Sequence, residues 1–157
     1  MYLLLFGNIT KIMSQGLHLV EEFLKSVDKV KHAYKQMILK VIRESGVDIT
    51  YEMLEVMRIL WNGDGVNQQV LANATLKDKV SLTYLIDHLT KRNWVIRVAG
   101  KEDRRSKLIY LTEEGKSLEL IFKPHMESIN LSVLNQVPPK EMESAIHLLD
   151  KVSKEWT

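Results

Sequence analysis

With 157 residues, 45% of them hydrophobic, and a net charge of +2, the chain has the composition of a folded globular protein rather than a disordered one. It has no cysteine, which excludes disulfides, thiolate metal sites and thiol redox sensing, and which fits a cytoplasmic protein. There is no apolar run of about 18 residues, so we expect no transmembrane helix.

The chain is expected to begin with a long amphipathic helix. Apolar residues recur every three or four positions from Gly16 to Glu44, and Ser45-Gly46 is a typical helix end. Residues 1–11 leave two alternatives open. They form an extended N-terminal arm, or they precede a start at Met13.

Four further helices are marked by side chains that can accept hydrogen bonds from a first helical turn. The predicted helices are 51–61 after Thr50, 68–74 after Asn67, 79–92 after Asp78, and 113–136 after Thr112. Pro124 lies inside the last of these and is expected to kink or split it, unless packing accommodates the bend. A final helix should begin at Lys140, after Pro138-Pro139, and end near Trp156.

Two alternating segments, 94–98 and 107–111, predict a β-hairpin, because apolar side chains at every second position are typical of strands. A charged loop with the sequence KEDRR, residues 101–105, lies between them. A helix followed by a basic-tipped hairpin is the pattern of a winged helix-turn-helix. In that motif the helix enters the major groove and the hairpin reaches along the DNA backbone.

Positive charge is concentrated around these elements. Residues 77–107 carry nine basic and four acidic side chains, a net +5, which leaves −3 for the rest of the chain. Such a concentration is typical of a protein that binds a phosphate backbone. The alternative is a solvated charged face with no such partner.

The outer face of the 79–92 helix is suited to a major groove, while Leu82, Leu85, Ile86 and Leu89 form its inward stripe. Lysine and hydroxyl side chains there can reach bases or phosphates, and Val80 can contact a thymine methyl group. The candidate DNA contacts in and around the helix and the hairpin are Gln68, Lys79, Val80, Ser81, Thr83, Tyr84, His88, Arg104, Arg105 and Lys107. Asp87 is expected to be structural, because phosphates repel carboxylates, and Asp103 is expected to be structural by holding the turn or an arginine.

Residues 68–97, QQVLANATLKDKVSLTYLIDHLTKRNWVIR, together with EDRRSKLIYLTEEG, resemble the MarR family of bacterial winged-helix transcription regulators. The wing signature of the family is matched by Asp103, Arg105, Leu111, Thr112 and Gly115. The resemblance implies an obligate homodimer with interleaved terminal helices that binds a palindromic DNA operator. It further implies a repressor, often released by a small phenolic or otherwise apolar ligand.

The chain departs from the family pattern at three places. Asn93 stands where glycine is usual before the wing, but asparagine tolerates a left-handed backbone. Leu76 replaces a common glycine in the bend between the two motif helices. Tyr84 and His88 stand where arginines are frequent, so DNA specificity or affinity is expected to differ from that of typical members.

We therefore predict a mostly α fold with a small β wing. A winged helix-turn-helix module, 49–112, is expected between an N-terminal arm and dimerisation helix, 1–48, and C-terminal dimerisation helices, 113–157. A ligand pocket would be lined by the first, second and fifth helices. Its candidates, chosen by position alone, are His32, Tyr51, Met57, Trp61 and Phe122. For each of them, ordinary core packing is the alternative.

No motif indicates catalysis, since GxSxG, phosphate-loop and HExxH sequences are absent. The five histidines are scattered without metal-ligand spacing, so we expect no metal, no cofactor and no enzyme. Two other functions remain open. One is a winged-helix module that binds another protein and has no specific DNA site. The other is a ligand-binding protein without operator affinity.

Overall fold

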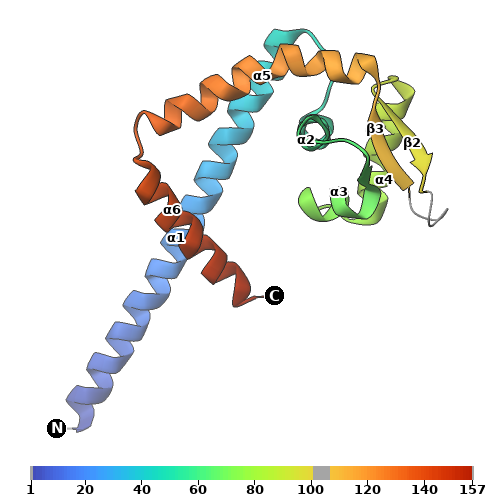
Figure 1. Cartoon of the computed structure of the whole chain (residues 1–157). Coiled ribbons are helices and arrows are strands. Elements are labelled where there is room, and N and C mark those ends of the chain that lie inside the picture. The colour runs from blue at the N-terminus through green and yellow to red at the C-terminus, as the bar shows by residue number, and fades with distance from the viewer. Residues whose placement is uncertain (1, 101–106, 157) are drawn as a thin grey trace. The chain divides into compact units, whose positions relative to one another are not determined.

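The computed structural model describes the backbone of residues 2–100 and 107–156, and the side chains from residue 14 onward. In chain order the elements are α1 (Tyr2–Ser45), α2 (Tyr51–Trp61), β1 (Val66–Asn67), α3 (Gln68–Ala74), α4 (Lys79–Lys91), β2 (Val95–Ala99), β3 (Lys107–Leu111), α5 (Glu113–Leu134) and α6 (Pro139–Lys154) (Figure 1). The predicted mostly helical fold with a small β wing is confirmed. The chain forms two compact units, residues 1–40 and 41–157.

The helix starts follow the predicted caps. A side-chain oxygen accepts a backbone N–H of the first turn at Thr50, Asn67, Asp78 and Thr112. Each such bond satisfies one of the donors that a helix N-terminus leaves unpaired. These starts could be predicted because the capping residue and its partner lie within three positions of each other.

The structure decides two points about the long helices that the sequence left open. The N-terminal segment is not an extended arm, since α1 already begins at Tyr2. Residues 2–15 contain no proline, and adding a turn to an existing helix costs far less than starting one. Pro124 does not split α5, which continues through it. Pro124 itself is exposed, while Phe122 and Met126 on either side of it are buried, so packing holds the helix together across the missing hydrogen bond.

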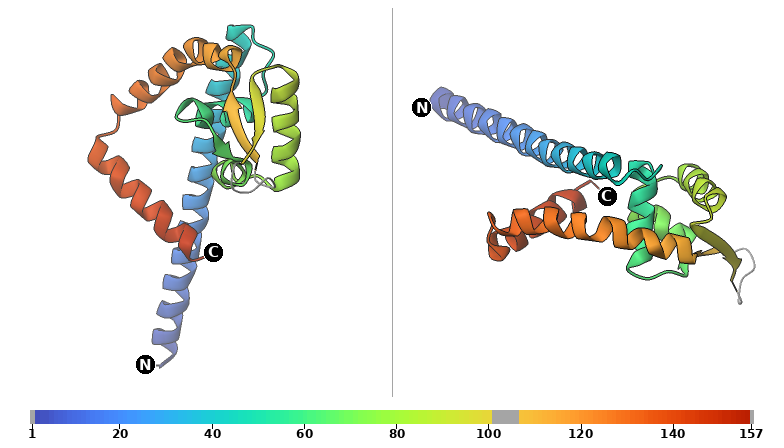
Figure 2. Two further views of the ribbon diagram at one scale, coloured as in Figure 1. Left: turned by 45° about the vertical axis from the view of Figure 1, so that its right-hand side comes forward. Right: turned by 90° about the horizontal axis from the view of Figure 1, so that it is seen from above.

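The sheet has three antiparallel strands in the order β1-β3-β2. β2 and β3 pair from Val95 with Leu111 to Ala99 with Lys107, which is the predicted hairpin. The third strand, β1, was not predicted, and it pairs Val66 with Ile109. In both views of Figure 2 the hairpin lies beside α4, against which β2 packs. The wing and the predicted recognition helix are therefore parts of one packed module.

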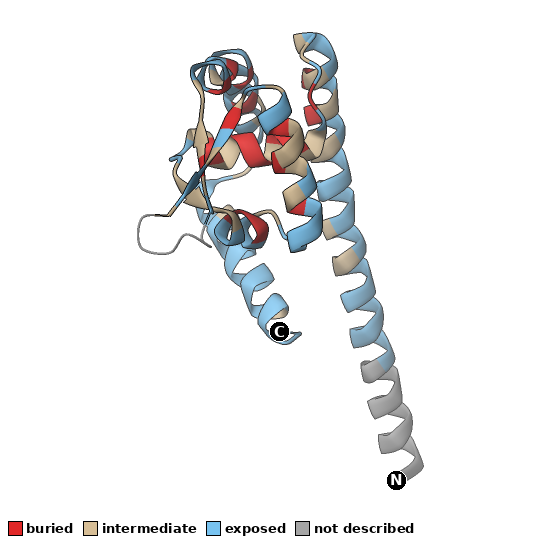
Figure 3. Cartoon of the chain, turned by 90° about the vertical axis from the view of Figure 1, so that its right-hand side faces the viewer, coloured by how far each residue is buried: buried red, intermediate tan, exposed pale blue. Residues whose placement is uncertain are grey.

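The core of this module is apolar, and Figure 3 colours its buried segments red. Its fully buried side chains come from α2, α3, α4, the hairpin and α5, and include Leu54, Met57, Leu60, Leu71, Leu82, Ile86, Leu89, Val95, Ile109 and Phe122. Leu85, predicted to face inward, is only half-buried. Burying each large side chain contributes roughly 1.5–3 kcal/mol, so the core fixes the position of α4.

The end of α5 and the whole of α6 are less buried than the module. α6 has no buried residue, and Leu131, Leu134, Ile146 and Leu149 of α5 and α6 are all more than 40% exposed. A helix whose apolar side chains stay in water is incompletely stabilised by its own chain. Within the described part of the chain, no helix has an apolar stretch long enough to cross a membrane.

Candidate nucleic-acid interface

One face of α4 is exposed over its first half and half-buried at Asp87 and His88. Leu82, Ile86 and Leu89 are fully buried on the opposite face. At the 3.6-residue period, Val80 and Tyr84 point away from these three, and they are 79% and 63% exposed. The face that the core leaves in water is thus partly apolar.

Two hollows lie on either side of this face. A hollow of about 670 Å³ is lined on the α4 side by Lys79 and Thr83, and also by Arg97 and Lys107 of the hairpin. The other, of about 580 Å³, is lined by Leu76, Val80 and Tyr84 together with residues of the same turn and Glu52 of α2. Between them α4 forms a ridge. A helix is about 10–12 Å across and the major groove of DNA about 12 Å wide, so such a ridge has the dimensions of a groove-binding helix.

The hydroxyl groups of Ser81 and Thr83, which were predicted to contact bases, already form hydrogen bonds within the protein. Ser81 donates its hydroxyl proton to Asp78 Oδ2 at 2.6 Å, and its backbone N–H donates to Asp78 Oδ1 at 2.8 Å. These bonds hold the pKa of Asp78 below its usual value. Thr83 donates its proton to the Lys79 carbonyl oxygen at 2.7 Å and accepts from Gln68 Nε2 at 2.7 Å. Neither hydroxyl has a free proton for a base edge.

Arg97 of β2 connects the wing to α4. Its Nη1 donates to Asp87 Oδ1, and its Nη2 donates to the Thr83 carbonyl oxygen at 3.2 Å. The hydrogen bond from Arg97 is the main reason why the pKa of Asp87 is lowered. Arg97 Nε is buried and has no hydrogen-bond partner among the described residues. This pair agrees with the structural role expected for Asp87, whereas Arg97 was noted in the sequence only as a basic residue.

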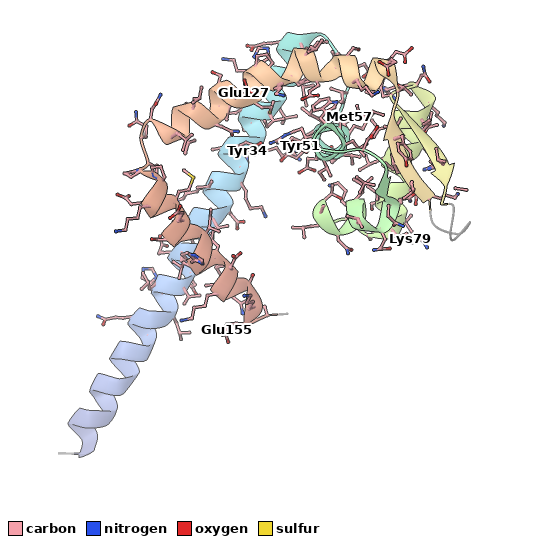
Figure 4. The ribbon with its side chains drawn as sticks, viewed as in Figure 1. Tyr34, Tyr51, Met57, Lys79, Glu127 and Glu155 are labelled. Carbon is pink, nitrogen blue, oxygen red and sulfur yellow. The ribbon has the colours of Figure 1, made fainter. Side chains whose placement is uncertain are left out.

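The basic residues of the module fall into two groups. Lys77 pairs with Glu55 at 3.2 Å, Arg92 pairs with Asp48 at 2.7 Å, and Arg97 pairs with Asp87. Within residues 77–100 and 107, the remaining cations are Lys79, Lys91 and Lys107, which are exposed and form no ion pair with a described residue. Figure 4 shows Lys79 at the start of α4. These three ammonium groups are the described cations of the module that remain free to meet an anionic partner.

Tyr84 and His88 form a ring pair on the exposed face. Their ring centroids are 4.2 Å apart and their planes are tilted by 58°. They are one helical turn apart, which brings side chains at i and i+4 together. The two rings therefore form one aromatic surface on this side of the helix.

The base of the wing is fixed by close backbone contacts. Asn93 adopts the left-handed conformation expected from the sequence, with φ +56°. Thr112 Oγ1 donates to the Asn93 carbonyl oxygen at 2.6 Å and accepts from Gly115 N at 3.0 Å. The tip itself, with the predicted contacts Arg104 and Arg105 and the predicted structural residue Asp103, lies outside the described residues.

The candidate ligand-pocket residues do not lie together around either hollow. Met57 and Phe122 are fully buried, and Trp61 stacks on Phe122 while its Nε1 donates to the Gly115 carbonyl oxygen at 2.9 Å. Tyr51 is half-buried at the start of α2, and Figure 4 shows it with Met57 on that helix. His32 is exposed on α1. Among the side chains that the structure describes, no group of three His, Asp or Glu residues could hold a metal ion.

Comparison with known proteins confirms the resemblance drawn from the sequence. The family model described as the MarR family matches residues 49–107, from just before α2 to the first residue of β3. The regulator SarZ of Staphylococcus aureus, an HTH-type transcriptional regulator, is 30% identical over 98 residues. That match covers 62% of this chain and 64% of the length of SarZ.

Solved structures share the fold over a longer stretch. MepR of Staphylococcus aureus, in its DNA-binding conformation, superposes with a TM-score of 0.76 and 22% identity over 86% of this chain and 98% of its own. The transcriptional regulator PcaV of Streptomyces coelicolor, in complex with its natural ligand, gives a TM-score of 0.68 and 17% identity over 83% of this chain and 91% of its own. Both likenesses extend beyond the segment that the family model matches.

Proposed function

We propose that this chain, with its MarR-type module at residues 49–107, is a transcriptional regulator that binds a DNA operator as a homodimer. α4 enters the major groove and the β2–β3 hairpin follows the adjacent backbone. The finer part of the proposal is a repressor of a palindromic operator that a small apolar or phenolic ligand releases. Because its partner is operator DNA, it acts in the cytoplasm.

The observation that carries the proposal is the exposed ridge of α4 with the three unpaired lysines around it. Lys79 lies at the start of the ridge, Lys91 at its end, and Lys107 on the hairpin. Cations spaced along a protruding helix can meet the phosphates on both sides of a groove while the ridge reaches the bases. The proposed contacts also include Arg104 and Arg105, which bring positive charge to the wing tip.

The uncovered apolar residues of α5 and α6 support the homodimer. Burying their exposed leucines and isoleucines against a second copy would remove that surface from water. Two-fold symmetry would then place two copies of α4 on one side of a duplex, about one helical turn apart. A palindromic operator matches this arrangement, because each half-site faces one copy of α4.

The proposal that a ligand releases the regulator from its operator is supported by the shared fold alone. PcaV, which shares the fold, is described with its natural ligand. The residues proposed for such a site in this chain remain His32, Tyr51, Met57, Trp61 and Phe122. Met57 and Phe122 would have to move apart to admit a ligand, since both are fully buried.

The second candidate function is a module that binds another protein. It is favoured by the exposed apolar side chains of Leu76, Val80 and Tyr84, which are also suited to a protein surface. The two functions differ in salt dependence. A DNA-binding protein holds arbitrary duplex weakly and loses it steeply as salt rises, whereas a protein-binding module shows neither behaviour.

The decisive experiment is selection of bound sequences from a random duplex pool at near-physiological salt, with the purified full chain. Enrichment of an inverted repeat with half-sites about one helical turn apart is the expected result. A folded protein that enriches no sequence and binds no duplex at low salt would refute the proposed function. Size-exclusion chromatography with light scattering on the same sample tests the homodimer.

A further inference from the structure

The face of α4 that would enter the groove has few groups able to read a base by hydrogen bonding. The protons of Ser81 and Thr83 are already donated within the protein. Purines and thymine present acceptors at the major-groove edge, and these acceptors need a donor. α4 contains no arginine, asparagine or glutamine, so lysine is the only side chain in it of the kinds that bind guanine or adenine with two bonds, and both lysines lie at its ends.

Instead, this face of α4 carries apolar side chains four residues apart. Val80 and Tyr84 are exposed and point away from the buried stripe, and His88 continues the row one turn further on. The Tyr84 ring contacts the His88 ring, so the two form one aromatic surface. The only apolar group that a base pair shows in the major groove is the C5-methyl group of thymine.

The unpaired lysines favour DNA over a protein as the partner of this face. Lys79 and Lys91 lie at the two ends of the row, and Lys107 lies on the neighbouring strand. None of them forms an ion pair with a described residue, although Lys91 is near enough to Asp87 to help lower the pKa of that carboxyl. An apolar row flanked by free cations is complementary to a groove floor of bases between two lines of phosphates.

We propose that Val80 and Tyr84 read thymine C5-methyl groups, so that each half-site carries thymines at the base pairs facing these two side chains. The inference rests on the proposed function and adds the base class that the same site selects. Arg97 supports the reading indirectly. Arg97 Nη2 donates to the carbonyl oxygen of Thr83, the residue just before Tyr84. This hydrogen bond limits rotation of α4 about its axis.

The test uses the operator obtained by selection with the full chain. Each thymine of a half-site is replaced in turn by deoxyuridine, which pairs with adenine identically but lacks the methyl group. We expect binding to weaken about fourfold at each contacted thymine, the effect of one buried methyl group, and to stay unchanged elsewhere.

Protein variants then show whether Val80 makes the contact with a thymine methyl group. Val80→Ala should weaken binding to the thymine operator and remove the difference between thymine and deoxyuridine at one position. Val70→Ala is the matched control, because Val70 is an exposed valine on α3 that lines neither hollow. It should leave both affinities and their ratio unchanged. Circular dichroism of both variants shows whether each is folded.

The outcomes separate this inference from the proposed function. If the chain selects an operator whose affinity is the same with deoxyuridine at every position, thymine reading is refuted and the regulator remains. If the Val80→Ala variant retains the full thymine preference at every position, Val80 is not a reader. If no sequence is enriched and no duplex is bound, both proposals fail, and the apolar row is better explained by a protein partner.

Discussion

Arg97 holds α4 at two successive turns, through the Asp87 carboxylate and the Thr83 carbonyl oxygen. The guanidinium comes from β2, so the same side chain fixes the angle between the wing and the ridge. A planar fork of donors is suited to this task, since it meets two acceptors with little freedom to rotate. Lysine could offer only a single rotating ammonium group in the same place.

Arg97→Gln is expected to weaken operator binding several-fold without changing its salt dependence. The side chain positions α4 but is paired within the protein, so its loss disturbs geometry and releases no counterion from DNA. The comparison is Lys107→Gln, which should lower the slope of log affinity against log salt by about 1. Fluorescence anisotropy over a salt series measures both. A reduced slope for Arg97→Gln would instead make Arg97 a phosphate contact.

The Asp87–Arg97 pair also predicts an acid dependence of stability. The pKa of Asp87 is lower in the folded chain than its ordinary value, because Arg97 donates to the carboxylate. Its contribution is therefore present above about pH 4 and is lost as the pH falls through the lowered folded pKa. Asp87→Asn should be less stable than the wild type at neutral pH, and the difference should shrink in acid. Urea unfolding at several pH values would show a constant difference if the pair were unimportant.

Gly115 is expected to tolerate no side chain. A Cβ there would lie 2.0 Å from the Trp94 carbonyl oxygen, which is backbone and cannot rotate away. Gly115→Ala should lower the free energy of unfolding by about 3 kcal/mol or more, or prevent folding.

Gly16→Ala is the matched control for that substitution, because a Cβ at Gly16 in α1 would have no atom within 4 Å. It should stabilise the helix by about 0.5–1 kcal/mol. Thermal unfolding followed by circular dichroism compares the two variants. Equal effects at the two glycines would contradict the close contact with Trp94.

Leu76→Gly is expected to stabilise the chain. Leu76 has φ +52° and its side chain is 94% exposed, so it carries left-handed strain with almost no packing in return. Relief of about 1 kcal/mol should raise the melting temperature by roughly 2–4 °C. Asn93→Gly, at φ +56°, should change it less, because asparagine tolerates this conformation. A lower melting temperature for Leu76→Gly would mean that the side chain makes contacts in the assembled protein.

Lys79→Gln should weaken binding to any duplex and lower the salt slope by about 1, because Lys79 is an unpaired cation beside the ridge. Lys77→Gln is the control two positions earlier. Lys77 is paired with Glu55 at 3.2 Å, so it should contribute less to counterion release. Titrations with non-specific duplex at several salt concentrations test both. Equal slopes for the two variants would contradict the division of the lysines into paired and free groups.

The sequence predicted the elements whose signals are local. The caps at Thr50 and Thr112, the hairpin and the left-handed Asn93 depend on residues within a few positions, and all are confirmed. β1 could not be predicted, because two residues show no period. It exists through pairing with β3, supported by the Asp64 carboxylate accepting from Leu111 N at 2.9 Å.

The site was predicted less completely than the fold. Which residues face outward follows from the helical period, so Val80 and Tyr84 could be identified. Which hydroxyl is already engaged depends on neighbours in space, and Gln68 reaches Thr83 from another helix. Ser81 is the exception, since the Asp-x-x-Ser spacing at 78–81 indicates that its hydroxyl can bond to the cap. The partner of Arg97 lies ten positions away and required the hairpin to be placed.

The absence of any buried residue in α6 has a consequence for how this protein would behave on dilution. A helix of this length that its own chain does not cover is marginal in water. If α6 packs against a second molecule, the melting temperature must rise with protein concentration, because association then forms part of the folding equilibrium. The number of copies in the cell would thereby set how much of the protein is folded as well as how many operators it can occupy.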